Sequence, residues 1–344
     1  MTLTDRLAAL ATLGERLQNL DTEPLNAVIR RTALHNSWLT EANQRAAITA
    51  IRDAFLQNKK LEKWVSQYAV QRTSNTVHQK TVALILAGNI PLVGFQDVLC
   101  VFVSGHRAKV KLSDKDPFLL PFLLKMLNEI DPRTAAYFET TDGRLTDFDA
   151  VIATGSNNSA RYFDAYFGKY PHIIRRNRNA IGILRGDETT ADFEKLADDV
   201  FLYFGLGCRN VSKLFVPKGY DFEPLLTVFH ERNALVLHDK YKNNFDYNFT
   251  LLILNKVKYQ SNGCILLHES EQIASPIAVL FYEFYDDFDV LETQLQARKE
   301  DIQLAVSKQN VANLPTFDFG EAQKPSLSDY ADGIDTLQFL IELA

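Results

Sequence analysis

Between residues 81 and 167 the sequence alternates short apolar runs with longer stretches of helical pattern, and this alternation constrains the fold more than any other feature. The apolar runs have the length of buried strands and lie at Thr81–Ala87, Ala108–Leu112 and Ala150–Ala153. The helical stretches follow them at Val93–Val103, Pro117–Ile130 and Ser156–Phe167. A strand followed by a helix, in units of about 30–40 residues, is typical of a parallel sheet with crossover helices. We therefore predict an α/β fold with a parallel sheet and crossover helices, and we expect Pro91 in the first turn of the first crossover helix.

The first 75 residues have helical patterns. Leucines recur at steps of three and four through residues 3–20 and define one apolar helix face: Leu3, Leu7, Leu10, Leu13, Leu17 and Leu20. Thr40 is placed to cap a second helix that runs to about Phe55, and residues 61–68 have the pattern of a third. We expect this helical N-terminus to pack on the domain that contains the sheet.

Composition, charge and cysteine usage exclude several classes of protein. With 344 residues, of which 46% are hydrophobic and 23% charged, the chain has enough apolar residues for two cored domains. A net charge of −6 gives no reason to expect binding to nucleic acid. The three cysteines are an odd number at wide spacings, which argues against a metal site and for a reducing compartment. No segment has the length of a membrane span and the N-terminus lacks a secretory signal pattern, so we expect a cytoplasmic protein.

Unusual residues follow the predicted strands. Gly88-Asn89 come after the first strand, Lys111 lies at the end of the second, and Gly155-Ser156 come after the third. Ligands of parallel α/β sheets bind at the carboxyl ends of the strands, although no G-x-G-x-x-G fingerprint is present. Gly155-Ser156 before a helix can receive a phosphate on unpaired amides. Each position also has a structural explanation: Asn89 as a turn residue, Lys111 as a solvated side chain and Ser156 as a helix cap.

The loop GLGCRNVSK, residues 205–213, holds Cys208 between an apparent helix and an apparent strand. A thiol that attacks a carbonyl needs a thiolate fraction, supplied by amides or nearby cations, and it needs room for the substrate. The glycines of the loop, with Arg209 and Lys213, offer both, but a cysteine in a glycine-rich helix stop has the same pattern. Cys100 and Cys264 lie in apolar runs, and we predict that both are buried.

Four stretches together resemble motifs of the aldehyde dehydrogenase superfamily. They are LAGNIPLVGF, VKLSDKDP, ATGSNNSAR and GLGCRNVSK, in the order and rough spacing of the superfamily motifs. The chain is most similar to the LuxC-type long-chain acyl-CoA reductases, from about residue 30 to the C-terminus. The resemblance implies an aldehyde-dehydrogenase-like fold with N-terminal helices at 1–75, a Rossmann-like NADP-binding domain at 76–180, a catalytic domain at 181–315, and a segment at 316–344 that returns to the cofactor domain.

The same resemblance assigns roles to five residues. Cys208 matches the catalytic thiol that attacks the acyl-CoA thioester. Asn89 matches the asparagine whose side-chain amide forms the oxyanion hole with the backbone N–H of that cysteine. Lys111 matches the lysine that contacts the adenosine ribose of the cofactor, and Gly155 and Ser156 match the Gly-Ser pair beside it.

The segment before the cysteine loop lacks a residue that hydrolytic aldehyde dehydrogenases have, a glutamate that activates water against the enzyme thioester. No Asp or Glu lies between Asp164 and Asp187. General base assistance is commonly worth about 10²–10⁴-fold, so an acyl group on Cys208 should survive until hydride or CoA removes it. The segment also contains Arg175, Arg176 and Arg178, which are candidates for binding the phosphates of CoA or NADPH. An ion-pair belt against an acidic helix near residues 192–199 explains these arginines equally well.

The resemblance thus implies the NADPH-dependent reduction of fatty acyl-CoA to fatty aldehyde through a cysteine thioester, by a homo-oligomer. Two alternatives stay open. One is a reductase of the same superfamily that acts on acyl carrier protein or on an acyl phosphate, and the other is a non-reducing acyl-transfer or scaffold protein with the same fold. The polar run Asn243–Asn248 is interpreted as a surface loop that borders the CoA entrance.

Overall fold

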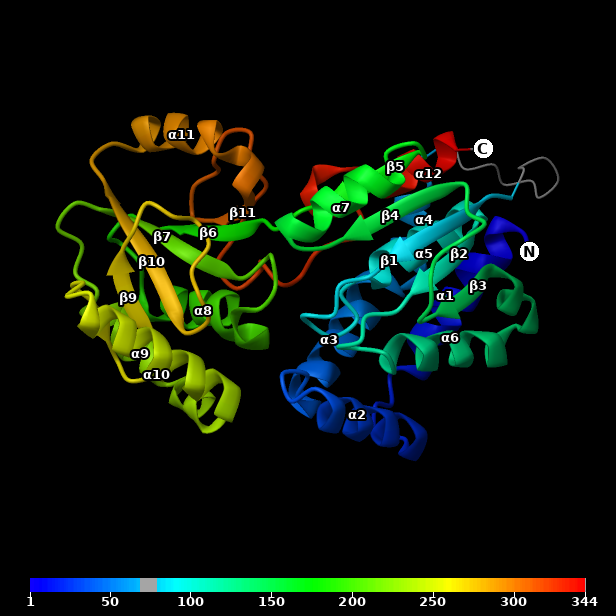
Figure 1. Cartoon of the computed structure of the whole chain (residues 1–344), viewed down its shortest axis with the longest axis horizontal. Coiled ribbons are helices and arrows are strands. Elements are labelled where there is room, and N and C mark those ends of the chain that lie inside the picture. Colours follow the sequence, from blue (N-terminus) through cyan, green and yellow to red (C-terminus); the bar gives the residue numbers. More distant parts are fainter. Residues whose placement is uncertain (69–78, 344) are drawn as a thin grey trace. The chain divides into compact units, whose positions relative to one another are not determined.

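The computed structural model describes residues 1–68 and 79–343, which form two compact units. Unit 1 comprises residues 1–176 and 325–344, and unit 2 comprises residues 177–324 (Figure 1). The predicted boundary between residues 75 and 76 lies outside the described residues. Each unit contains its own sheet.

The N-terminal part of unit 1 is helical, as predicted. Its helices are α1 (Leu3–Arg16), α2 (Glu23–His35), α3 (Glu41–Phe55) and α4 (Asn58–Val65). Thr40 caps α3 as predicted, because its Oγ1 accepts a hydrogen bond from the Asn43 N–H at 3.2 Å. Helix α1 ends at Arg16 and not at Leu20. The Asn19 side chain accepts a hydrogen bond from the Asp21 N–H at 2.9 Å, and such local turns compete with helical hydrogen bonding.

The sheet of unit 1 has five parallel strands in the order β3-β2-β1-β4-β5. The strands are β1 (Thr81–Ile85), β2 (Arg107–Lys111), β3 (Phe138–Thr141), β4 (Ala150–Thr154) and β5 (His172–Arg175). The three predicted strands are present with small changes at their ends, and β3 and β5 were not predicted. From β1 the chain winds outward to β3 and then returns to the other side of β1, so the sheet is doubly wound.

Helices cover both faces of this sheet. They are α5 (Phe95–Ser104), α6 (Leu119–Ile130) and α7 (Asn157–Phe167), with a 3-10 turn, η1 (Pro132–Tyr137), before β3. Val82 and Leu84 of β1 join the core that contains α1, α5 and α6, whereas Ala83 between them joins Phe167 of α7. This alternation matches a strand buried on both faces, which the continuous apolar run at residues 81–87 predicts.

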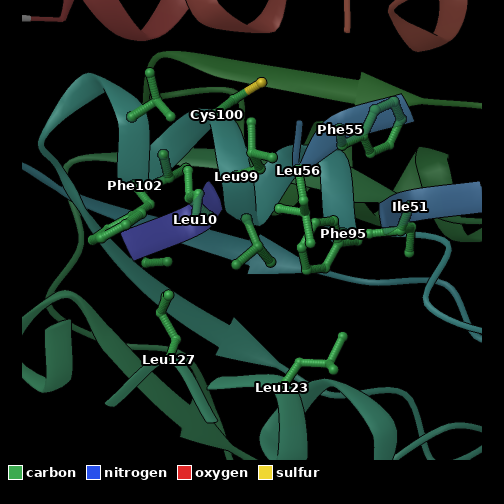
Figure 2. Close-up of a cluster of buried hydrophobic side chains, with 14 of the residues drawn as sticks. Leu10, Ile51, Phe55, Leu56, Phe95, Leu99, Cys100, Phe102, Leu123 and Leu127 are labelled. Carbon is green, nitrogen blue, oxygen red and sulfur yellow. The ribbon is translucent and has the colours of Figure 1, made fainter. Parts of the chain in front are cut away.

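The larger core of unit 1 is built around α5. Figure 2 shows Leu99, Cys100 and Phe102 of this helix among side chains of α1, α3 and α6, and all three are buried. Helix α5 begins at Phe95, so Pro91 precedes the helix and the prediction that it lies in the first turn is wrong. The reason is local, because Leu92 has a left-handed backbone with φ of 56°, which no α-helix accommodates.

Residues 325–343 complete unit 1 after the chain has left unit 2. They contain the 3-10 turn η5 (Ala331–Gly333) and helix α12 (Thr336–Glu342), which packs against α5. The Trp64 Nε1–H donates a hydrogen bond to the Tyr330 hydroxyl at 2.8 Å, and the Tyr68 hydroxyl donates to Asp335 at 2.7 Å. The C-terminal segment is therefore bonded to the end of the N-terminal helical region.

Unit 2 contains a seven-stranded sheet in the order β12-β11-β6-β7-β10-β9-β8, in which only the β8–β9 pair is antiparallel. Its strands are β6 (Asn179–Ile183), β7 (Val211–Pro217), β8 (Gln260–Ser261), β9 (Leu266–Glu269), β10 (Val279–Tyr285), β11 (Ile302–Val306) and β12 (Thr316–Phe317). Its helices are α8 (Thr190–Phe201), α9 (Glu223–His230), α10 (Asp239–Leu254) and α11 (Phe288–Ala297), with 3-10 turns η2 (Leu202–Gly205), η3 (Asn233–Leu237) and η4 (Lys299–Asp301). Helices α8 and α9 pack on one face of the sheet and α11 packs on the other.

One prediction in unit 2 is wrong. The polar run Asn243–Asn248 is not a loop but lies inside α10. Phe245 and Asn248 of this run are buried, whereas Asn243, Asp246 and Tyr247 are exposed, so the helix buries one narrow face.

Candidate active site

The carboxyl ends of β1, β2 and β4 lie next to one another in the sheet of unit 1. The strand register pairs Ile85, the last residue of β1, with Lys111 of β2 on one side and with Ala153 of β4 on the other. The β1–β4 boundary is the point at which the winding of the chain reverses, and open α/β sheets bind ligands at such points. The structure therefore brings the three strand ends that carry Asn89, Lys111 and Gly155-Ser156 to one edge of the sheet.

The loop after β1 is fixed on both sides of Asn89. A Cβ on Gly88 would lie 2.3 Å from the Ser113 hydroxyl oxygen, so only glycine fits at this close approach. On the other side, the Leu92 N–H donates a hydrogen bond to the Asp116 carboxylate at 3.0 Å. Asp116 is buried, and this burial raises the pKa of its carboxyl. Asn89 is half-buried between these two fixed points.

The loop after β4 leads directly into α7. Ser156 is exposed and caps the helix, because its Oγ accepts a hydrogen bond from the Ser159 N–H at 3.1 Å, so the cap interpretation is confirmed. A Cβ on Gly155 would lie 2.8 Å from a ring carbon of Phe163, so the loop packs closely on the helix that it precedes. Lys111 is half-buried at the same edge. A cation and the amino end of a helix at the same edge of a sheet are a donor set that suits phosphate groups, so these residues fit a dinucleotide cofactor.

Arg175 has a structural role. Its side chain is buried, and its Nη1 forms an ion pair with Asp97 of α5 at 2.6 Å while its Nη2 donates to the Thr336 hydroxyl at 2.8 Å. Its guanidinium therefore joins β5, α5 and α12 within unit 1. These contacts remove Arg175 from the candidates for phosphate binding.

Arg176 and Arg178 lie nearer to the surface. The Arg176 guanidinium pairs with Asp164 at 2.9 Å, and the Arg178 guanidinium pairs with Glu300 at 3.0 Å. Asp164 and Glu300 are both well exposed, and exposed ion pairs are worth only about 0–1 kcal/mol, so these two contacts leave Arg176 and Arg178 among the candidates for phosphate binding. The acidic helix that the sequence offered as the partner, α8, pairs with other cations: Asp192 with Lys308 and Asp198 with Arg232.

Cys208 lies in the loop that connects α8 to β7 in unit 2, where it is half-buried. Three consecutive residues before it, Tyr203, Phe204 and Gly205, have left-handed backbones with φ of 56°, 59° and 74°. A left-handed backbone costs roughly 1–2 kcal/mol at each non-glycine residue, so surrounding contacts must hold it in place. Backbone strain of this kind clusters at functional sites.

Residues 207–210 form a tight turn with Cys208 as its second residue. The Asn210 N–H donates to the Gly207 carbonyl at 3.0 Å, and the Asn210 side-chain oxygen accepts from the Gly207 N–H at 2.8 Å. The amide nitrogen of the same side chain donates to the carbonyls of Asp199 at 3.0 Å and Leu202 at 2.9 Å, at the end of α8. A thiol held in a turn with fixed backbone dipoles can be presented to a carbonyl in a constant orientation.

The two cations of the loop have partners of their own. The Arg209 Nε–H donates to the Ala322 carbonyl, and its guanidinium lies 4.8 Å from the centre of the Phe317 ring. The Lys213 side chain is fully buried and forms an ion pair with Glu283 of β10, and burial lowers the pKa of its ammonium. Glu283 thus neutralises Lys213, and the prediction that this lysine supports the thiolate is not supported.

Two residues near Cys208 were not identified from the sequence. Asn210 stands in the quoted loop, but its interaction with the end of α8 follows only from the three-dimensional structure. Asp199 accepts hydrogen bonds from the N–H groups of Gly320 at 2.6 Å and Ala322 at 3.0 Å, and its burial raises the pKa of its carboxyl to about 6. The partners of Asp199 are more than a hundred residues away along the chain, so no local pattern could have indicated them.

Cys100 and Cys264 are buried, as predicted, and burial raises the pKa of both thiols, for Cys264 to about 11. Both thiols are therefore poor nucleophiles at neutral pH. Among residues 1–68 and 79–343, no group of three or more His, Cys, Asp or Glu side chains is arranged to hold a metal ion. Within the same described ranges, no helix combines the length and the apolar composition needed to cross a membrane.

Solved aldehyde dehydrogenases have similar folds. Aldehyde dehydrogenase 21 from Physcomitrella patens, in complex with succinate, is 13% identical with a TM-score of 0.72 over 100% of this chain and 84% of its own. An oxidoreductase from Marinobacter aquaeolei is 10% identical with a TM-score of 0.69 over 99% and 85%. An aldehyde dehydrogenase from Bacillus cereus, in complex with NAD⁺, is 15% identical with a TM-score of 0.64 over 90% and 73%. These similarities confirm the aldehyde-dehydrogenase-like α/β fold.

No curated protein matches the chain. The sequence profile of one family, described as acyl-CoA reductase (LuxC), matches residues 8–224, which is more than half of the chain. The match includes the loop after β1, the end of β2, the start of α7 and the turn that holds Cys208. The chain therefore belongs to the acyl-CoA reductase (LuxC) family, and the protein is an oxidoreductase.

Proposed function

We propose that the protein reduces fatty acyl-CoA to fatty aldehyde with NADPH, through a thioester on Cys208. The observation that carries this proposal is the setting of Cys208, a half-buried thiol in a tight turn after a strained backbone, inside the region that matches the acyl-CoA reductase family. The other two thiols are buried and have raised pKa values, which favours Cys208 as the nucleophile.

In the first half of the proposed reaction, the Cys208 thiolate attacks the thioester carbonyl carbon. A new C–S bond forms to Cys208, the C–S bond to CoA breaks, and CoA leaves as a thiolate. The side-chain amide of Asn89 is proposed to donate a hydrogen bond to the oxyanion that develops on the carbonyl oxygen. Removing one such donor typically costs about 10²–10³ in turnover.

In the second half, Cys208 holds the acyl group until it is reduced. NADPH, when bound, supplies the hydride. The C–S bond to Cys208 then breaks, the thiolate returns, and the aldehyde is released. A thiolate is a good leaving group, so this step makes little demand for a dedicated acid. The absence of Asp and Glu between Asp164 and Asp187 supports the proposal, because it leaves that segment without a base to activate water against the thioester.

Lys111, Gly155 and Ser156 are proposed to hold the cofactor at the carboxyl edge of the unit 1 sheet. Lys111 supplies a positive charge and the amino end of α7 supplies backbone N–H groups. Arg176 and Arg178 are further candidates for binding phosphate, of CoA or of NADPH. The preference for NADPH over NADH is tested by comparing the two in the same assay, with Lys111→Met expected to weaken the binding of the preferred cofactor.

The central experiment follows acylation and reduction separately. Purified protein is incubated with a radiolabelled long-chain acyl-CoA without NADPH, and the labelled peptide is identified by mass spectrometry. We expect the label on Cys208, its loss in Cys208→Ala, and its retention in Cys100→Ala and Cys264→Ala, which change buried thiols. Addition of NADPH should then release the label as aldehyde while the absorbance of NADPH decreases.

The remaining outcomes select among the alternatives. An unlabelled Cys208 in folded protein rules out the thioester mechanism. Labelling without consumption of NADPH or NADH points to acyl transfer. If acyl carrier protein labels Cys208 much faster than acyl-CoA does, the donor is a carrier protein.

A further inference from the structure

The side chain of Asn210 holds the turn that contains Cys208 from within. This residue is almost completely buried, with 1% of its surface exposed. Its backbone N–H and its side-chain oxygen bind the carbonyl and the N–H of Gly207, at 3.0 and 2.8 Å. Both backbone polar groups of the residue before Cys208 are therefore bonded to Asn210.

The other end of the Asn210 side chain binds the end of α8. A helix end leaves carbonyl groups without intrahelical partners, and here the Asn210 amide nitrogen donates to the carbonyls of Asp199 and Leu202, at 3.0 and 2.9 Å. Directly after Leu202 the backbone becomes left-handed at Tyr203 and Phe204. The Asn210 side chain thus bonds both to the end of α8, before the strained segment, and to Gly207 in the turn, after it.

The residue after Cys208 is also anchored. Arg209 donates to the Ala322 carbonyl, and the N–H of Ala322 donates in turn to Asp199 at 3.0 Å. The segment that contains Ala322 is therefore bonded both to the end of α8 and to the turn. Cys208 therefore lies between Gly207, which is bonded to Asn210, and Arg209, which is bonded to a residue outside the turn.

We propose that Asn210 is a positioning residue, which fixes the direction of the Cys208 thiol and of the Cys208 backbone N–H. This inference rests on the proposed role of Cys208 as the nucleophile. Asn210 touches no reacting atom; it acts through the turn. Misplacement of a reacting group by about 1 Å can cost roughly a hundredfold in rate, so a turn that relaxes slightly lowers the acylation rate without removing the substrate site.

The test uses the full chain with Asn210→Ala and Asn210→Asp. The alanine variant loses all of the side-chain hydrogen bonds, and the aspartate variant keeps an acceptor for Gly207 but loses the donor to α8. The matched control is Gln44→Ala, because Gln44 of α3 is also buried and its amide nitrogen donates to the carbonyls of Ile29 at 3.0 Å and Leu39 at 2.6 Å. Transfer of the acyl group from long-chain acyl-CoA to Cys208 is followed by rapid quenching, and hydrogen exchange of the 202–210 peptide is measured by mass spectrometry.

We expect the acylation rate at saturating acyl-CoA to fall at least about tenfold in both Asn210 variants, as for a displaced nucleophile, while the half-saturating concentration changes less than about twofold. In both Asn210 variants, hydrogen exchange should become faster than in the wild type in the 202–210 peptide and stay unchanged in β7 and β10. The Gln44→Ala variant should acylate like the wild type. If alanine prevents folding, the nearly isosteric aspartate variant carries the test.

Either of two results would overturn the inference. One is acylation at the wild-type rate in a folded Asn210 variant, even with faster exchange. The other is an equal loss in Gln44→Ala, which would show a general effect of losing a buried amide. If the wild-type protein is not acylated, the proposed function fails, and the rate at which iodoacetamide alkylates Cys208 in the same variants then tests the role of Asn210 by itself.

Discussion

The buried ion pair between Asp97 and Arg175 gives the sharpest prediction about stability. Both side chains are about 94% buried, since 7% and 6% of their side-chain surfaces are exposed, and the two charged atoms are 2.6 Å apart. Replacing Arg175 with Met leaves the Asp97 carboxylate buried without its counter-charge. Breaking a buried pair in this way costs about 3–5 kcal/mol. Typical domains have stabilities of about 5–15 kcal/mol, so the variant should lose a large part of the total.

A double-mutant cycle separates the pair from its surroundings. Asp97→Leu alone should also destabilise, because it leaves the Arg175 guanidinium buried and unpaired. The double variant with Arg175→Met should recover most of the loss, since apolar replacements of buried pairs are often neutral. The loss of stability caused by Arg175→Met should persist in high salt, because salt screens buried ion pairs only weakly.

The assay is urea unfolding followed by tryptophan fluorescence. The chain has two tryptophans, Trp38 and Trp64, and both belong to unit 1, which contains the ion pair. Cofactor affinity is measured in the same variants under conditions where they are folded. If Arg175→Met unfolds at the wild-type urea concentration but binds NADPH or CoA more weakly, the structural assignment of Arg175 is refuted and its role as a phosphate ligand is restored.

Three further predictions concern other parts of the molecule. Burial raises the pKa of the Asp199 carboxyl to about 6, against about 3.9 for an exposed aspartate, so folding disfavours its ionised form. The stability of the wild type relative to Asp199→Asn should therefore rise as the pH falls from 6 towards 4, by about 3 kcal/mol at most, in denaturation curves across that range. Glu283→Gln should lower the thermal midpoint more than Lys213→Met does. It leaves a fully buried ammonium without a counter-charge, with the Ser270 carbonyl still accepting from it, whereas Glu283, with 29% of its side chain exposed, can be hydrated. Gly155→Ala should destabilise the protein by about 1–3 kcal/mol and weaken cofactor binding measured by calorimetry, because the added Cβ would lie 2.8 Å from the Phe163 ring. An unchanged stability and an unchanged cofactor affinity would mean that the loop after β4 can shift freely.

The sequence was sufficient for the parts of the fold that local patterns determine. Strand β1 was predicted because its residues are apolar on both faces, and α3 was predicted because Thr40 is a good cap. Strand β3, with the sequence FETT, was missed because it lies at the edge of the sheet, where half-exposed polar residues give no apolar run. Helix α10 was partly misread because its polar run resembles a loop.

In the candidate site, too, local patterns identified some residues, whereas contacts that form only in the folded chain stayed hidden. Asn89, Lys111 and Gly155 could be proposed because each lies at or just after the end of a predicted strand, and the register then placed these strand ends together. The burial of Arg175 could not be foreseen, because its partners Asp97 and Thr336 lie on helices that come to β5 only in the folded chain. When several arginines lie close together in the sequence, the sequence does not indicate which of them is buried in the core.

The return of the C-terminal segment to unit 1 has a consequence for synthesis on the ribosome. Tyr330, which bonds to Trp64, and Leu337 and Leu340 of α12, which are fully buried, are translated after the whole of unit 2. At about 5–20 residues per second, unit 1 stays incomplete for roughly 7–30 s after its first part has emerged. During that time the surface of α5 that α12 later covers is open to water or to chaperones. Unit 2, whose residues are continuous in the chain, can finish folding first.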